Sequence, residues 1–169
     1  MHPVNDERPL AAWVALVQAH GVVLEGVERR LVAEAGLPVS WYEVLVRLSR
    51  ADEERMRMQD LARSVLLSKS GLTRLADRME AAGLVERRAC ATDRRVTYVA
   101  LTHRGREALE RAQPVFASGV EHHLAYHLPA EDLDRLTGAL QRVIRGNGEA
   151  VDDCVEPAAT PVAAAARSS

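Results

Sequence analysis

The fold of this 169-residue chain is decided by one stretch, SKSGLTRLADRMEAAG, which spans residues 68–83. Apolar residues recur in it at three- and four-residue steps, which predicts a helix with one apolar face. That face consists of Leu72, Leu75, Ala76 and Met79. Ser68 is a favoured N-cap residue, and Gly83 suits the left-handed position that follows a helix. The stretch therefore predicts an amphipathic helix that begins at Ser68 and is stopped by Gly83.

The polar face of this helix has the residue types of a DNA-reading surface. It carries Ser70, Thr73, Arg74 and Asp77. Short hydroxyl side chains let a helix lie deep in a major groove, and arginine can donate two hydrogen bonds to guanine. The free N–H groups at the start of a helix also favour phosphate. An ordinary amphipathic surface helix with a serine cap has the same pattern, so the helix alone leaves both interpretations open.

A basic hairpin follows the helix. Residues 84–88 and 96–101 are predicted strands, the second because its first four residues are β-branched or aromatic. The polar segment 89–95 between them has the size of a hairpin loop. The arginines of this hairpin are Arg87, Arg88, Arg94 and Arg95. A basic hairpin tip fits a narrow minor groove, and Asp93 is expected to orient a neighbouring guanidinium by a forked pair of hydrogen bonds.

Outside this centre the chain is predicted to be mostly helical. The remaining elements expected are helices over 6–35, 41–50, 60–65, 103–127 and 129–145 and a short strand over 55–58. Ser40 and Thr102 are expected to cap the helices that follow them. Pro114 is expected to kink or break its helix, and Gly21 and Gly26 to interrupt the first one.

Two short helices followed by a β-hairpin form the plan of a winged helix-turn-helix, so the fold class is mainly α (α+β). The long outer helices cannot bury their apolar stripes on so small a centre, and a partner chain is therefore expected to cover them. The predicted divisions are an N-terminal dimerisation helix (1–38), the winged domain (39–102), C-terminal dimerisation helices (103–146) and a disordered tail (147–169).

The charge is unevenly spread along the chain. The formal net charge is −2, but residues 60–106 carry +5 between flanks of −2 and −5. A basic centre is typical of a nucleic-acid-binding surface, and a solvated arginine surface is the alternative. No apolar run approaches the roughly 20 residues of a membrane span, no signal peptide is recognisable, and two cysteines make no disulfide framework. A cytoplasmic protein without membrane contact is therefore expected.

At this point the sequence resembles the multiple-antibiotic-resistance regulator (MarR) family. The resemblance runs from about Ser40 to Leu109 and is carried by Leu61-Ala62, the helix from Ser68 to Arg78, residues 79–85, Asp93-Arg94-Arg95, and Leu101-Thr102 with Gly105. The Asp-x-Arg wing followed by Leu-Thr at this spacing is the specific part of the match. Leu128 departs from the pattern, because the family often has a Ser or Thr cap there.

The resemblance implies a homodimeric winged-helix transcriptional regulator, usually a repressor, that binds double-stranded DNA. The helix from Ser68 would enter a major groove, Arg95 would enter the minor groove with Asp93 as its support, and Arg78 would reach phosphate. The residues expected to contact DNA are Ser68, Lys69, Ser70, Thr73, Arg74, Arg78, Arg88, Asp93, Arg94 and Arg95. The symmetry predicts a near-palindromic operator with half-sites about one helical turn apart.

Family members often release DNA when a small aromatic acid or phenol enters a cleft beside the dimerisation helices. Trp13, His20, Trp41 and Tyr42 are the candidates to line such a cleft, because Trp and Tyr offer apolar walls with a polar handle. The alternative is that these side chains pack the dimer core.

Two other switches remain open, and an enzyme is not expected. His123 and His127, with Glu121 and His122 nearby, have a spacing suited to zinc if other ligands converge; solvated histidines are the alternative. Cys90 lies among arginines that would lower the pKa of its thiol, whereas Cys154 lies in the tail. No catalytic triad spacing, H-E-x-x-H, P-loop or G-x-G-x-x-G is present, and no cofactor is implied.

Overall fold

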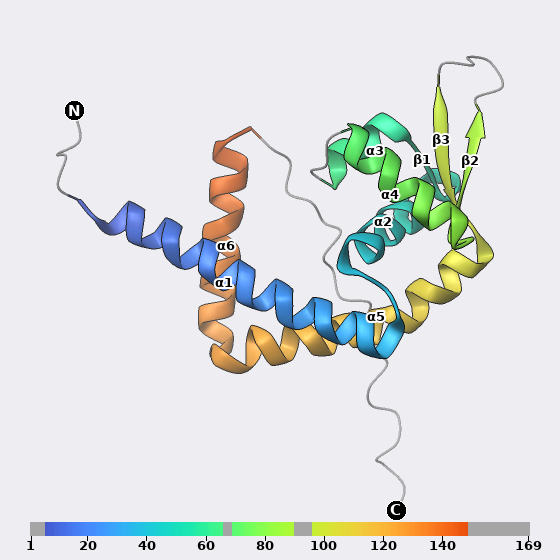
Figure 1. The fold of residues 1–169 in the computed structure, drawn as a ribbon. Helices are drawn as coiled ribbons and strands as arrows, with labels where there is room; N and C mark the ends of the chain where they lie inside the picture. The colour runs from blue at the N-terminus through green and yellow to red at the C-terminus, as the bar shows by residue number, and fades with distance from the viewer. Residues whose placement is uncertain (1–5, 66–68, 90–95, 149–169) are drawn as a thin grey trace, which may run out of the picture.

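The computed structural model describes residues 6–65, 69–89 and 96–148, with only the backbone of Lys69. Figure 1 shows a winged unit connected to two long helices and a separate terminal helix. The elements are α1 (Arg8–Arg30), η1 (Leu31–Ala35, π-helical), α2 (Val39–Arg50), η2 (Asp52–Glu54), β1 (Arg55–Arg57), α3 (Met58–Ser64), α4 (Lys69–Ala81), β2 (Val85–Ala89), β3 (Thr97–Leu101), α5 (His103–His123), η3 (Ala125–His127) and α6 (Ala130–Gly146). The mainly helical winged fold predicted from the sequence is confirmed.

The winged unit is built around a small antiparallel sheet. Its order is β1-β3-β2, so the third strand lies between the other two. Arg57 and Arg88 flank Tyr98 in the register, and Met56 and Arg87 flank Val99. Because side chains alternate between the faces of a strand, the sheet presents Val99 and Leu101 to the core and Tyr98 to the outside.

One hydrophobic core joins the winged unit to the long helices. Leu45 and Leu48 of α2, Leu72 of α4 and Val99 of β3 are completely buried, and Leu31 of η1 belongs to the same cluster. Val27 of α1 and Ala108, Leu109 and Ala112 of α5 extend the cluster into the arms. The second half of α1 and the first half of α5 therefore hold the winged unit, while the rest of each helix extends beyond it.

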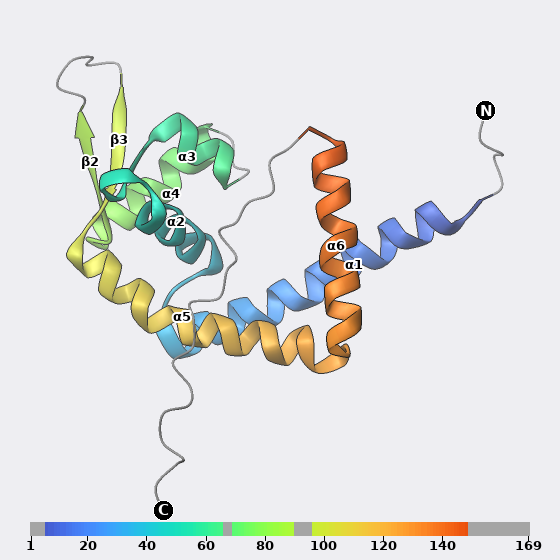
Figure 2. The same ribbon diagram turned by 180° about the vertical axis from the view of Figure 1, so that it is seen from behind.

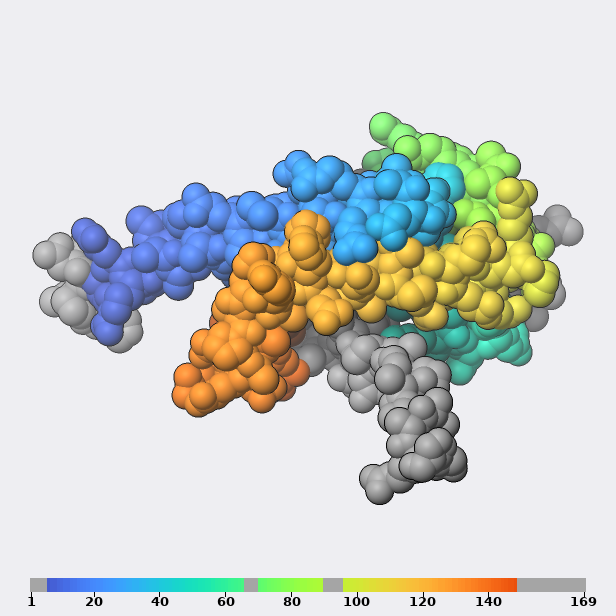
Figure 3. All heavy atoms as spheres, turned by 90° about the horizontal axis from the view of Figure 1, so that it is seen from below, coloured from blue at the N-terminus to red at the C-terminus, as the bar shows by residue number. Residues whose placement is uncertain are grey.

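The outer parts of α1 and α6 are hardly buried in one copy of the chain. Figures 2 and 3 show the N-terminal half of α1 projecting from the body and α6 standing apart from the winged unit. Leu10, Trp13 and Val17 of α1 are 66%, 62% and 50% exposed, and no residue of α6 is buried. In a single chain these apolar side chains are therefore exposed to water, as is typical of a surface that contacts a partner.

One helix of the described chain, Arg8–Ala35, is long and apolar enough by length and composition to cross a membrane. Its most apolar window has a mean hydropathy of 1.5, and 11% of that window is buried. The expectation that no apolar run approaches such a length is therefore wrong. The three- and four-residue period of this segment predicted an amphipathic helix. Its charged residues, however, lie near its two ends and leave its middle apolar.

The helix ends confirm some sequence predictions and correct others. Thr102 caps α5 by accepting a hydrogen bond from the Gly105 N–H at 3.0 Å. α2 starts one residue before Ser40, and its first N–H, that of Val39, donates to the Glu28 carboxylate of α1 at 2.6 Å. α1 continues through its two glycines, and α5 continues through Pro114 without a break. A partner distant in sequence thus replaces the cap expected from Ser40.

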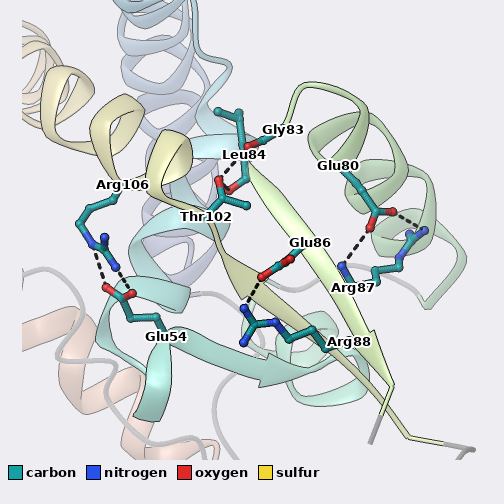
Figure 4. A network of polar contacts seen from close by, with 9 residues as sticks. All are labelled: Glu54, Glu80, Gly83, Leu84, Glu86, Arg87, Arg88, Thr102 and Arg106. Atoms are coloured by element: carbon teal, nitrogen blue, oxygen red, sulfur yellow. Dashed lines mark hydrogen bonds and ion pairs between the residues drawn. The ribbon is translucent and has the colours of Figure 1, made fainter.

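A strained turn between α2 and β1 is paired with a side chain of α5. Glu53 and Glu54 have φ of 52° and 50°, a left-handed backbone that side chains disfavour. Figure 4 shows the Glu54 carboxylate accepting from Nε and Nη2 on one edge of the Arg106 guanidinium, with Oε1 3.0 Å from Nε. This two-point pair from α5 stabilises the turn just before the edge strand β1.

Candidate nucleic-acid interface

The outer face of α4 carries a stripe of polar and basic side chains. Ser70, Arg74 and Arg78 recur every four residues and are exposed, whereas Leu72 and Met79 on the opposite face are completely buried. Within the described residues, neither Arg74 nor Arg78 forms an ion pair. Their guanidinium groups therefore remain available to an external acceptor such as a base edge or a phosphate.

The two adjacent arginines of β2 point to different partners. Arg88 is exposed on the outer sheet face and pairs with Glu86. Arg87 is only 26% exposed and its Nη1 lies 2.5 Å from Oδ1 of Asp77 in α4. The alternation of the strand turns Arg87, one of the arginines of the basic hairpin, inward toward the helix, whereas Arg88 stays on the outer face.

An aromatic ring with arginines around it lies on the outer face of the sheet. The Arg55 guanidinium lies 5.1 Å from the centre of the Tyr98 ring, and that of Arg57 lies 6.0 Å away. Arg57 also donates a long hydrogen bond of 3.4 Å to the Tyr98 hydroxyl. These contacts orient the edge strand, while Glu53 pairs with Arg55 and Glu86 pairs with Arg88, so that carboxylates offset part of the positive charge on this face.

Several residues and segments for which the sequence analysis makes a prediction lie outside the described residues. These are Ser68, Asp93, Arg94, Arg95, the Lys69 side chain, Cys90 and the tail from residue 149 with Cys154. The predicted roles of the wing tip and of the serine before α4 therefore stay predictions.

The four candidate ligand residues are not gathered into one cleft of the single chain. Tyr42 stacks on Phe116 of α5 with 4.4 Å between ring centres, and burial raises the pKa of its hydroxyl. Trp41 is half-buried against the core, whereas Trp13 is 62% exposed on the projecting part of α1. His20 is exposed near Glu43: burial raises the pKa of the Glu43 carboxyl, and the charges of Arg47 and then His20 lower it to a smaller extent.

The histidines near the end of α5 lack the geometry of a metal site. The helix ends at His123 and His127 lies in a 3₁₀ turn, so the helical spacing expected of this pair does not exist. Among the described residues, no group of three His, Cys, Asp or Glu side chains is placed to hold a metal ion. The zinc alternative loses the geometric observation that suggested it.

His123 instead packs into the space left by a glycine. A side chain at Gly26 would come within 2.6 Å of its imidazole ring. Desolvation and then the charges of His122, Arg29, Arg30 and His127 lower the pKa of His123. Two open cavities of about 380 and 420 Å³ adjoin this corner, but their arginines are already paired, Arg29 with Glu25 and Arg30 with Glu34.

The polar contacts that connect α4, the wing and α5 were not predicted from the sequence. Arg87 with Asp77 and Glu80, and Arg106 with Glu54, form pairs across 7 to 52 residues of sequence. One signal was present: Asp77 and Glu80 place two carboxylates on a helix expected to approach phosphates. Carboxylates in that position call for nearby cations.

Comparison with known proteins identifies the family of this fold. Residues 35–96 match the family model of the MarR family. The crystal structure of AbsC, a MarR family transcriptional regulator from Streptomyces coelicolor, is 33% identical, and the match covers 86% of this chain and 98% of AbsC with a TM-score of 0.76. Sco3205, a MarR family regulator from the same organism solved in complex with DNA, is 27% identical over 86% of this chain and 91% of its own, with a TM-score of 0.78.

A curated relative gives the same assignment over a shorter span. The HTH-type transcriptional regulator YdgJ of Bacillus subtilis (strain 168) is 34% identical over 53% of this chain. The match covers 56% of YdgJ, so this chain spans about half of that relative's length. The match to AbsC covers 86% of this chain and therefore extends beyond the winged unit into the long helices. The chain belongs to the MarR family of DNA-binding transcriptional regulators.

Proposed function

We propose that this protein is a homodimeric repressor that binds a near-palindromic operator and is released from it by a small aromatic ligand. The observation that carries the proposal is the exposed stripe Ser70, Arg74 and Arg78 on α4, with two arginines that no carboxylate of the described chain neutralises. Buried apolar residues on the opposite face fix the direction of this stripe. It therefore has the geometry of a helix that reads a major groove.

In this proposal, contacts divide between base reading and phosphate binding. Arg74 reads a base edge with help from the hydroxyls of Ser70 and Thr73, and Arg78 contacts phosphate. The remaining contact residues are Ser68, Lys69, Arg88, Asp93, Arg94 and Arg95. Of these, Arg95 enters the minor groove beside Asp93. The DNA complex of Sco3205 supports this docking mode by similarity of fold and sequence.

The exposed apolar residues of α1 and α6 supply the homodimer contact. Leu10, Trp13 and Val17 of α1 and Val143 and Ile144 of α6 are each more than a third exposed. A second copy with the same unsatisfied surfaces is a self-complementary partner, as two-fold symmetry requires. In this proposal, residues 1–38 and 103–146 serve dimerisation and residues 39–102 bind DNA, in the cytoplasm.

Repression and its relief are supported by two further relatives. MprA of Escherichia coli (strain K12), 29% identical over 54% of this chain and 52% of its own, is named a transcriptional repressor. CouR from Rhodococcus jostii RHA1, 26% identical over 76% of this chain and 88% of its own with a TM-score of 0.65, was solved bound to p-coumaroyl-CoA. In this chain, Trp41 and Tyr42 lie where the winged unit meets α5, and in the dimer Trp13 and His20 complete an aromatic cleft there.

Arg74→Ala is expected to weaken binding to the operator by about 1–3 kcal/mol and to relax specificity at one base pair, because a two-point contact to a base edge is lost. The measurement is a fluorescence-anisotropy titration with DNA from upstream of the protein's own gene, against a scrambled duplex. Arg142→Ala, an exposed arginine of α6, is the matched control and leaves affinity unchanged. Equal affinity of the unmodified protein for both duplexes would overturn the proposal.

A phenolic or aromatic acid is expected to release the preformed operator complex and to quench tryptophan fluorescence with the same midpoint. Both effects arise from one population shift, since a ligand moves an equilibrium only by binding one state more tightly. Salicylate and 2,4-dichlorophenol serve as probes, and Trp41→Phe is expected to remove most of the quenching. Release without saturable quenching, or quenching that Trp41→Phe leaves unchanged, would contradict the cleft.

A further inference from the structure

Arg87 bonds to the flank of α4 over two turns of the helix. Besides its ion pair with Asp77, its Nη1 lies 3.3 Å from Glu80 Oε2 and its Nη2 donates to the Thr73 carbonyl oxygen at 3.1 Å. The Arg87 backbone N–H donates to Glu80 Oε1 at 2.9 Å, a contact drawn in Figure 4. One residue of β2 thus holds three residues of the helix at positions i, i+4 and i+7.

The flank that Arg87 holds is not the DNA-facing stripe. At about 100° per residue, Thr73, Asp77 and Glu80 lie between the buried face and the stripe of Ser70, Arg74 and Arg78. Rotation or tilting of α4 against β2 would therefore move the stripe relative to the wing. The bonds from Arg87 oppose that movement at β2, the strand that follows α4 and begins the hairpin.

The contacts of Arg87 with Asp77 and Glu80 also reduce the negative charge of α4 near the proposed DNA. The Asp77 side chain is 54% exposed and that of Glu80 40% exposed, on a helix that is to approach phosphates. Uncompensated, both carboxylates would repel the DNA backbone. The Arg87 guanidinium pairs with both carboxylates and neutralises part of this charge. Its own positive charge is therefore compensated within the protein and not by a phosphate.

We infer that Arg87 is a positioning residue: it fixes the angle between the groove-reading helix and the wing and thereby sets operator discrimination, without contacting DNA. This inference rests on the proposed DNA-binding function and deepens it. Its physical basis is that a planar guanidinium has several donors in a fixed fork, which bind a carbonyl and a carboxylate in one geometry. Major-groove and minor-groove contacts then form together only when that geometry is kept.

The test compares Arg87→Gln with Arg88→Gln, a neighbour on the same strand that faces outward. Arg87→Gln is expected to weaken operator binding about tenfold or more while changing binding to scrambled DNA far less, because discrimination depends on simultaneous contacts. The slope of log affinity against log salt concentration stays as in the unmodified protein. For Arg88→Gln, loss of one phosphate contact would reduce that slope by about 0.9 at similar discrimination.

Two further variants separate geometry from charge. Arg87→Lys keeps the charge, so lysine rescues a purely electrostatic role but not a positioning role. Asp77→Asn removes a carboxylate near DNA: it lowers discrimination if Asp77 holds Arg87, and raises affinity for all DNA if Asp77 only repels phosphate. All variants are checked for unchanged thermal unfolding, and Arg87→Lys serves if Arg87→Gln does not fold.

Hydrogen exchange on the free protein gives a reading that does not depend on DNA. Arg87→Gln is expected to speed exchange of the α4 amides, whereas Arg88→Gln leaves them unchanged. A reduced salt slope with unchanged α4 exchange would show that Arg87 contacts phosphate and would overturn the inference, as would full rescue by lysine. If the unmodified protein binds no operator, the proposed function fails, while the exchange data still decide whether Arg87 holds α4.

Discussion

Val14→Glu combined with Val17→Glu is expected to convert the proposed dimer into a monomer and to lower operator affinity about a hundredfold or more, because two linked half-site contacts become separate events. Both residues lie on the same side of α1, where 45% and 50% of their surfaces are exposed in one chain. A charge placed in an apolar contact must lose its hydration without a partner, which opposes association.

The measurement is light scattering, which distinguishes the 18.5 kDa chain from a particle of twice that mass. Gln59→Glu is the matched control: it also adds a negative charge at an exposed position, but on α3, away from both arms. Circular dichroism is the check that the helices persist in the double variant. A double variant that keeps the dimer mass would show that this part of α1 is not the interface.

Gly105→Ala is expected to destabilise the fold by about 2–4 kcal/mol, because a methyl group has no room at this position. Its Cβ would come 2.1 Å from the Leu84 carbonyl oxygen and 2.8 Å from Leu101 Cδ1. The same oxygen accepts from the Thr102 hydroxyl at 3.0 Å, the contact shown in Figure 4. Relief of the clash would therefore pull apart the junction of α5 with the strands of the wing.

Urea unfolding at one protein concentration measures this loss, since dimer stability depends on concentration. Gly146→Ala is the matched control: beyond its chain neighbours and its own helix backbone, nothing in the described part of the chain lies within 4 Å of the added methyl group at the end of α6. That variant is expected to be neutral or more stable by up to about 1 kcal/mol, as alanine favours a helix. Equal unfolding midpoints for Gly105→Ala and the unmodified protein would show that the junction yields without cost.

The winged unit could be predicted from sequence because its signals are local. The period of apolar residues in α4, Gly83 after the helix and Thr102 before α5 each act within a few residues, and all appear in the structure. The boundaries of the strands and helices shifted by one or two residues, which is ordinary at frayed ends. The end of α5 moved four residues, and with it the basis for pairing His123 and His127.

The candidate site was predictable only in part. Ser70, Arg74 and Arg78 follow from helical periodicity, because one buried face fixes the direction of the other. Arg87 and Arg88 are neighbours of the same type, and only their places in the sheet distinguish them. Strand alternation sends the first toward α4 and the second outward, which no composition or spacing of the hairpin reveals.

By itself, the sequence determined the class of fold, the amphipathic helix that we propose faces DNA, and the family resemblance, since all three depend on local periodicity and short motifs. Only the tertiary structure decided how α4 is held: Arg87 contacts Thr73, 14 residues away, and Arg106 contacts Glu54, 52 residues away. Such pairs form between segments brought together by the core, so hydrophobic burial places them and their charges then fix the angles.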